Sequence, residues 1–134
     1  MQRATVTEQG WNEAIAQLAA GECTLLGLWG DPPNVYMATI DETTGTIAII
    51  TYACTDGRYP SVGAQHPPAV RLERAISSLF GLEAAGAPDT RPWLDLGFWD
   101  VHHPLGKTQP AQKSDVYEFL PVEGESLHQI PVGP

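Results

Sequence analysis

The chain has 134 residues, 43% of them hydrophobic and 17% charged, which suits one domain with a core of its own. Its 16 acidic residues outweigh its 7 basic residues and give a net charge of −9. This charge argues against nucleic acids and anionic membrane surfaces as partners, because both require clustered positive charge.

The sequence predicts no membrane contact of its own. No apolar run approaches the length of a membrane span, and polar residues rather than an apolar signal segment precede the first helix. We therefore expect a cytoplasmic protein, and any link to a membrane would come through a partner.

The first predicted element in the chain is a helix over residues 7–20. Thr7 is a suitable N-cap, and Gly21 is typical of a helix C-terminus. Between them, apolar residues recur at helical spacing, namely Trp11, Ala14, Ile15, Leu18 and Ala19.

Three strands are predicted next, over residues 23–30, 35–41 and 46–54. The first is an apolar run, "CTLLGLWG", and "GDPPN" supplies a turn before the second strand. The residues "ETTG" close a hairpin into the third strand, which is rich in β-branched residues. Trp11 and Trp29 are predicted as core residues, and a further short strand is expected near Tyr59.

A second helix is predicted to begin near Pro68 and to end at Gly81. Its apolar stripe consists of Leu72, Ile76, Leu79 and Phe80. Beyond it, glycine, proline and tryptophan dominate, and one more short strand is expected around residues 117–120. The pattern predicts an α+β fold: a two-layer helix/sheet sandwich of helix, β-meander and helix, followed by extended C-terminal arms. We expect a core domain over 1–83, an irregular arm over 84–122 that packs on the core or on a partner, and a tail over 123–134.

The cysteines and histidines give weak signals for chemistry. Cys23 and Cys54 lie in apolar runs, which favours buried thiols, although neighbouring strands could also join them in a disulfide. No histidine has a cysteine at ligand spacing, and the neighbouring side chains of His102 and His103 diverge. We therefore predict no metal site. No nucleophile elbow, phosphate loop or dinucleotide fingerprint is present either.

The strongest cluster of charged residues consists of Glu73, Arg74, Asp89 and Arg91. We interpret it as an ion-pair network that holds the arm on the second helix, because such networks fix geometry more often than they catalyse reactions. The alternative is an independent small enzyme or ligand-binding module that uses Glu73, Asp89 and His103. That alternative predicts a pocket with convergent polar groups.

Two tryptophans, Trp93 and Trp99, lie in the irregular arm. Large aromatic residues in such a segment serve either as anchors for a partner protein or as pins that hold the arm on its own domain. The sequence alone leaves both interpretations open.

Residues 59–107 resemble one known family. Its motifs are a Pro-Ser-(Val/Leu) segment, Glu-Arg-x-x-x-Asp-Leu-Phe-Gly, Gly-His-Pro-Asp-x-Arg, a Trp and His-Pro-Leu. In this chain the matching residues are Pro60-Ser61-Val62, Glu73-Arg74 through Leu79-Phe80-Gly81, Gly86 with Pro88-Asp89 and Arg91, and Trp99 with His103-Pro104-Leu105. The family is that of the thirty-kilodalton subunit of respiratory complex I (the NADH dehydrogenase or NADH-quinone oxidoreductase). It includes relatives in the membrane-bound NiFe hydrogenases of formate-hydrogenlyase type.

The chain departs from the family pattern at three positions. Ser78 stands where the family usually has Asp, Ala87 replaces a His, and Gly106 replaces an Arg. The stretch over residues 91–106 is most similar to the hydrogenase branch. The tail over 123–134 resembles the linker and the first residues of the large-subunit module to which such domains are often fused.

The resemblance implies a non-catalytic scaffold in a multisubunit oxidoreductase. The implied partners are a large catalytic-type subunit and a small iron–sulfur subunit, which would carry the iron–sulfur clusters and, in a hydrogenase, the NiFe centre. No cofactor is expected in this chain, because a NiFe centre requires two Cys-x-x-Cys pairs and Cys23 and Cys54 lie far apart. Trp93, Trp99 and His103-Pro104-Leu105 are the residues expected to contact a partner. Membership of a true quinone-reducing complex I is a further alternative.

Overall fold

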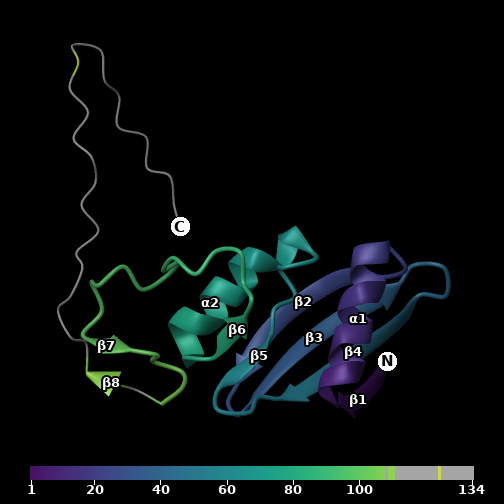
Figure 1. The fold of residues 1–134 in the computed structure, drawn as a ribbon, viewed down its shortest axis with the longest axis horizontal. Coiled ribbons are helices and arrows are strands. Elements are labelled where there is room, and N and C mark those ends of the chain that lie inside the picture. Colours follow the sequence, from purple (N-terminus) through teal and green to yellow (C-terminus); the bar gives the residue numbers. More distant parts are fainter. Residues whose placement is uncertain (108, 111–123, 125–134) are drawn as a thin grey trace.

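The computed structural model describes residues 1–107, 109, 110 and 124. Its centre is a four-stranded sheet in the order β1–β4–β3–β2, with the helices α1 and α2 beside it (Figure 1). The bounds of these elements are β1 Gln2–Val6, α1 Glu8–Ala20, β2 Thr24–Asp31, β3 Asn34–Asp41, β4 Thr46–Ala53 and α2 Val70–Phe80. The predicted α+β class is confirmed.

Helix α1 begins and ends where the sequence predicts. The Thr7 side chain accepts a hydrogen bond from the Gly10 N–H, and Gly21 ends the helix in the left-handed conformation at φ 73°. The buried side is formed by Trp11, Ala14, Ile15 and Leu18. Ala19, which we assigned to the same side, is exposed.

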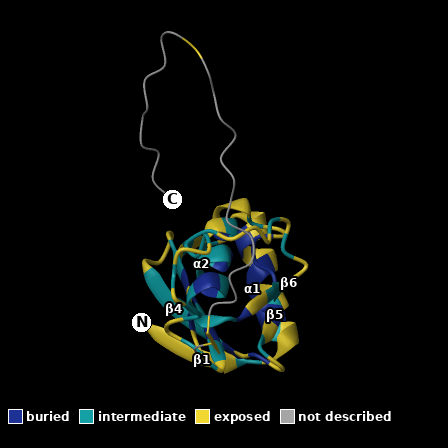
Figure 2. Cartoon of the chain, turned by 90° about the vertical axis from the view of Figure 1, so that its left-hand side faces the viewer, coloured by how far each residue is buried: buried dark blue, intermediate teal, exposed yellow. Residues whose placement is uncertain are grey.

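Strand β1 was not predicted. It pairs in parallel with β4, with Gln2 opposite Ala48 and Val6 opposite Tyr52. Its first four residues are exposed, and Figure 2 shows β1 in the colour of exposed residues. A short edge strand with polar side chains carries neither the apolar alternation nor the apolar run by which a strand is predicted.

The sheet buries one face only. Along β3, Val35, Met37 and Thr39 are buried, whereas Tyr36 and Ala38 between them are half-buried. This alternation is typical of a strand in a sheet with one covered face. We call the side of the sheet that faces the helices the inner face and the opposite side the outer face. Gly30 belongs to the inner face, because a Cβ there would lie 3.1 Å from the Phe80 ring of α2.

The prediction that Trp29 is a core residue is wrong. Trp29 follows the buried Leu28, so its side chain lies on the outer face, where it is 39% exposed. There it stacks on Tyr36 of the neighbouring strand, with ring centroids 5.4 Å apart and an interplanar angle of 9°. A continuous apolar run does not show which side chains face the core.

The core is centred on Trp11, which is fully buried as predicted. Its indole N–H donates to the Pro60 carbonyl at 2.9 Å, and its ring contacts Tyr52 and Tyr59. The strand expected near Tyr59 is β5 (Arg58–Pro60), which pairs in parallel with the unpredicted β6 (Glu83–Ala85). Figure 2 shows buried residues on the sides of α1 and α2 that face this core.

Both cysteines are free thiols, Cys54 buried and Cys23 half-buried. Burial raises the pKa of the Cys54 thiol to about 11 and, with smaller contributions from nearby carboxylates, also raises that of Cys23. Neither thiol has the lowered pKa of a reactive cysteine.

Helix α2 follows a 3₁₀ turn, η1 (Pro67–Ala69), and ends at Gly81 as predicted. Of its predicted apolar stripe, Ile76 is buried, and the other three residues are half-buried. Two polar residues, Glu73 and Ser78, are buried in addition. The chain after β6 contains two short strands that were not predicted, β7 (Val101–His102) and β8 (Gln109–Pro110). The strand expected at 117–120 and nearly all of the tail lie outside the described residues.

Candidate functional site

Residues 86–107 run from the end of β6 past α2, and we call this segment the arm (Figure 1). Apart from β7, the arm consists of turns, bends and irregular segments. Side-chain contacts and turns, rather than a sheet, therefore hold it in place.

Arg74 of α2 is the central anchor of the arm. Its guanidinium donates to the Arg91 carbonyl at 2.7 Å, to the Pro92 carbonyl at 2.9 Å and to the Asp89 carboxylate at 3.1 Å. Arg91 also contacts Asp89, at 2.7 Å. Hydrogen bonds from Arg91 and the nearby Arg74 charge hold the pKa of Asp89 well below its usual range. The structure therefore joins three of the four predicted cluster residues.

Glu73, the fourth residue of that cluster, has a different place. It is 2% exposed, and its carboxylate accepts hydrogen bonds from the Ser61 hydroxyl at 2.9 Å, the Val62 N–H at 2.6 Å and the Gly63 N–H at 3.2 Å. Burial raises its pKa, and the three donors act in the opposite direction. Glu73 therefore fixes the turn after β5 to α2, whereas we had grouped it with the charges that hold the arm.

Trp93 lies against the same helix. The guanidinium groups of Arg71 and Arg74 are 5.3 Å and 4.9 Å from its ring centroid, within the range of cation–π contacts. Trp93 is half-buried, so it pins the arm to its own domain. Trp99 is also half-buried. Contact of either tryptophan with a partner stays a prediction.

The end of the arm covers the C-terminus of α2. The Leu105 N–H donates to the Leu79 carbonyl at 2.9 Å, which satisfies one of the carbonyls that a helix end leaves without a partner. The His103 ring lies over Gly81, where a Cβ would be 3.0 Å from the ring. A Cβ at Gly106 would be 2.2 Å from the Phe80 carbonyl oxygen, so this close approach requires glycine.

A cleft of about 490 Å³ lies between the arm, α2 and β6, and its lining includes Glu73, Asp89 and His103. These are the residues of the alternative enzyme hypothesis. Each of them already contacts α2, the arm or the turn after β5. Beside them, His102 lies 2.5 Å from the Asp95 carboxylate. Within the described residues, no group of three His, Cys, Asp or Glu side chains is placed to bind a metal ion.

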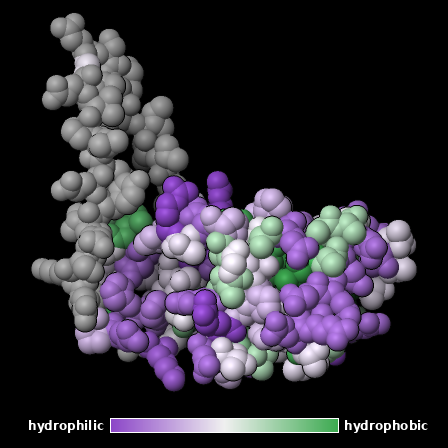
Figure 3. All heavy atoms as spheres, viewed as in Figure 1, coloured by the Kyte–Doolittle hydropathy of each residue, from purple (hydrophilic) through white to green (hydrophobic). Residues whose placement is uncertain are grey.

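Two large apolar side chains of the arm face solvent, Phe98 at 68% and Leu105 at 61% exposure. Pro104, next to Leu105, is exposed as well. The face of the molecule shown in Figure 3 is mostly hydrophilic, with smaller hydrophobic patches. Sequence reasoning singled out Pro104 and Leu105 but missed Phe98, although an apolar ring between Gly97 and Trp99 in a segment without periodicity was a usable signal.

Comparison with known proteins gives consistent results. A sequence profile described as "Respiratory-chain NADH dehydrogenase, 30 Kd subunit" matches residues 33–115, more than half of the chain. Hydrogenase-4 component G of Escherichia coli (strain K12) is 32% identical over 112 residues, which cover 75% of this chain and 20% of that protein. Formate hydrogenlyase subunit 5 of the same organism is 33% identical over 86 residues, which cover 57% of this chain and 15% of that protein. The chain thus spans a fifth or less of the length of these relatives.

A solved structure is similar in fold. The structure described as "Nqo5 of the trypsin-resistant fragment (1-134) in P63 form" aligns with a TM-score of 0.53 and 22% identity, over 65% of this chain and 80% of that chain. No helix of the described part of the chain is long and apolar enough to cross a membrane. The matched profile shows that the chain belongs to the family of 30-kDa subunits of the respiratory-chain NADH dehydrogenase, which includes hydrogenase relatives.

Proposed function

We propose that the chain is a non-catalytic scaffold subunit of a multisubunit, membrane-associated oxidoreductase. In this proposal it docks the large catalytic-type subunit and helps to place the small iron–sulfur subunit, and these partners carry the metal cofactors. Membership in the 30-kDa subunit family supports the assembly, and the similarity to two hydrogenase components favours the hydrogenase type. The complex would hold the chain at the cytoplasmic side of the membrane.

The observation that carries this proposal is the way the arm is held. Arg74, Trp93 and the Leu105 N–H fix the arm on α2, yet Phe98 and Leu105 remain exposed. Exposed apolar side chains on a held backbone are typical of a docking surface, because little conformational entropy is lost when a partner binds.

The test is an affinity purification of the tagged chain from its own cells under conditions that preserve membrane complexes. We expect co-purification of a large subunit and a small iron–sulfur subunit, identified by mass spectrometry. Two Cys-x-x-Cys pairs in the large subunit would identify a hydrogenase, and their absence would identify a quinone-reducing complex.

The variant Leu105→Asp tests whether the arm is the docking surface. We expect it to reduce recovery of the large subunit at least tenfold, because a charge in the centre of an apolar contact is costly to desolvate. Ala16→Asp, on the exposed side of α1, is the matched control and should leave recovery unchanged. Equal recovery with both variants, or a chain that purifies alone, would contradict the proposal.

A further inference from the structure

The outer face of the sheet is apolar although no element of the described chain covers it. Along β2, β3 and β4 its side chains alternate with those that face the core, and the register places them side by side. They are Gly27, Trp29, Tyr36, Ala38, Ile40, Ile47, Ile49 and Thr51. Leu26 lies at the β-bulge between Leu25 and Gly27 and has no register partner. It follows Leu25, which packs against the core, so alternation places Leu26 on the outer face as well. Antiparallel strands with one face in water normally carry polar side chains on that face.

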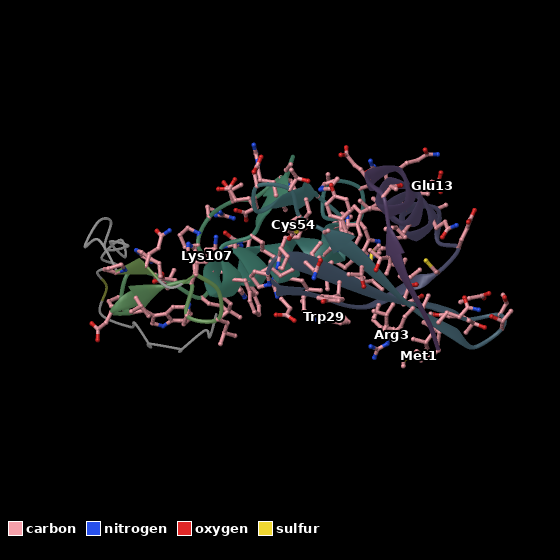
Figure 4. All side chains as sticks on the ribbon, turned by 90° about the horizontal axis from the view of Figure 1, so that it is seen from below. Met1, Arg3, Glu13, Trp29, Cys54 and Lys107 are labelled. Atoms are coloured by element: carbon pink, nitrogen blue, oxygen red, sulfur yellow. The ribbon has the colours of Figure 1, made fainter. Side chains whose placement is uncertain are left out.

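Figure 4 shows the two sides of the sheet. Trp29 and Arg3 lie on one side of the sheet, and Glu13 of α1 lies on the other. Helix α2 also lies on the inner side, because Gly30 faces its Phe80 ring. Both helices therefore leave the outer face open, and Leu26 on it is 53% exposed.

The outer face has small residues at its centre and acidic residues at its ends. Gly27 and Ala38 are opposite each other in the register, next to the stacked rings of Trp29 and Tyr36. Asp31 closes β2 next to the buried Gly30, so it lies at one end of the outer face. Asp41 closes β3 two residues after the buried Thr39 and belongs to the inner face.

Glu42 supplies a carboxylate at the other end of the outer face. It accepts a hydrogen bond from the Thr24 hydroxyl at 2.7 Å, and the register partner of Thr24 is Ile40 of the outer face. In the four strands, Arg3 is the one basic residue.

We propose that the outer face is a second docking surface, which binds an amphipathic helix of a partner subunit whose apolar stripe is flanked by lysine or arginine. The three strands β2, β3 and β4 span about 10 Å at ~4.8 Å spacing, which matches the ~10 Å diameter of one helix. Basic flanks would meet the acidic strand ends, and small residues at the centre let the helix approach closely. This surface is separate from the arm and extends the proposed function.

A second copy of the chain fits this face poorly. Two copies would bring acidic strand ends together, and each chain carries a net charge of −9. The apolar strip measures on the order of 260 Å² for strands of this spacing and rise, whereas a stable complex buries about 800 Å² on each partner. A helix that belongs to an already assembled partner does not need this strip to supply the whole interface.

Site-specific photocrosslinking in the cells of origin tests the proposal. The crosslinking amino acid p-benzoyl-phenylalanine replaces Leu26 on the outer face, Leu105 on the arm or, as a control, Ala16 on α1. We expect the probe at Leu26 to capture a helical peptide of another subunit with an apolar stripe and basic flanks, and the probe at Ala16 to capture none. Because the crosslinks from the probes at Leu26 and at Leu105 are analysed separately, failure of the arm proposal is distinguishable from failure of this one.

A binding measurement then uses the captured segment as a synthetic peptide with the purified full chain. We expect Ile49→Lys to weaken the Kd at least tenfold and Leu26→Lys to weaken it severalfold, whereas Ala16→Lys changes it less than twofold. Leu26 is exposed, so its variant keeps the test valid if Ile49→Lys does not fold. Crosslinks from Leu26 to a second copy, to residues 111–134 of the same chain or to nothing would each overturn the proposal, as would equal binding by all variants.

Discussion

The carboxylates of Glu73 and Asp89 stabilise different parts of the molecule, although Glu73 belongs to α2 and Asp89 contacts Arg74 of the same helix. Glu73 is buried and accepts hydrogen bonds from two backbone N–H groups and one hydroxyl of residues 61–63. Asp89 belongs to the arm, and its partners are the guanidinium groups of Arg74 and Arg91. The first therefore orders a turn of the core, and the second holds the arm.

Replacement of Glu73 by alanine should destabilise the fold. Alanine removes both acceptor oxygens and leaves the Ser61 hydroxyl and the Val62 and Gly63 N–H groups without this partner. We expect the free energy of unfolding to fall by about 2 kcal/mol, as is usual when buried donors lose their acceptor. Denaturant unfolding followed by circular dichroism measures this change.

The matched control for Glu73→Ala is Glu13→Ala on the exposed side of α1, where Glu13 accepts a hydrogen bond from Gln9. We expect its effect to stay below about 0.5 kcal/mol, as is usual for surface substitutions. A loss of the same size in both variants would show that the contacts of Glu73 with residues 61–63 add nothing to stability.

The end of the arm is an element that depends on one glycine. Gly106→Ala places a methyl group 2.2 Å from the Phe80 carbonyl oxygen, a backbone atom that cannot move without disturbing α2. We expect the arm to lift from the helix end and the Leu105 N–H to lose protection against hydrogen exchange at least tenfold. Gly27→Ala is the control, because its methyl group would meet the Trp29 ring at 3.8 Å, an ordinary contact. Unchanged protection of Leu105 in Gly106→Ala would contradict this account.

Local signals in the sequence were sufficient for the central elements. The cap at Thr7, the glycines at 21 and 81 and the β-branched run over 46–54 each act within a few residues, and the elements formed as predicted. The family motifs in residues 59–107 also led to the family that the profile shows.

The features that the sequence did not reveal depend on distant contacts. Strand β1 is defined by its pairing with β4, and the position of Trp29 on the outer face depends on which side of the sheet the helices cover. In the sequence, Glu73 stands next to Arg74 and was therefore grouped with other charged residues. In the structure, its carboxylate instead accepts hydrogen bonds from the backbone N–H groups of Val62 and Gly63. The arm has no periodicity, so its contacts with α2 had no local signal.

On the scale of the whole molecule, the two surfaces that we propose lie on different parts of the structure. The arm presents Phe98 and Leu105 beside α2, whereas the outer face lies across the sheet from both helices. A chain of this form can contact two partners at once, and this is what a scaffold between a large subunit and a further subunit requires. Release of the arm should then leave the sheet, and the second surface, intact.

Acid should release the arm before it unfolds the core, because the two carboxyls respond to pH in opposite directions. The pKa of Asp89 is lowered in the folded protein, so its contribution to stability is present above about pH 4 and is lost as the pH falls toward the folded pKa. The pKa of Glu73 is raised, so protonation of Glu73 favours the folded state, and its contribution is lost only as the pH rises. We expect the hydrogen-exchange protection factor of the Leu105 N–H to fall as the pH drops below the usual aspartate pKa of about 3.9. The protection factor of the Val62 N–H should not change over this range. In Asp89→Asn, Leu105 protection should be low and independent of pH over this range. A simultaneous fall at Leu105 and Val62 in the wild-type chain would show that arm and core respond as one unit.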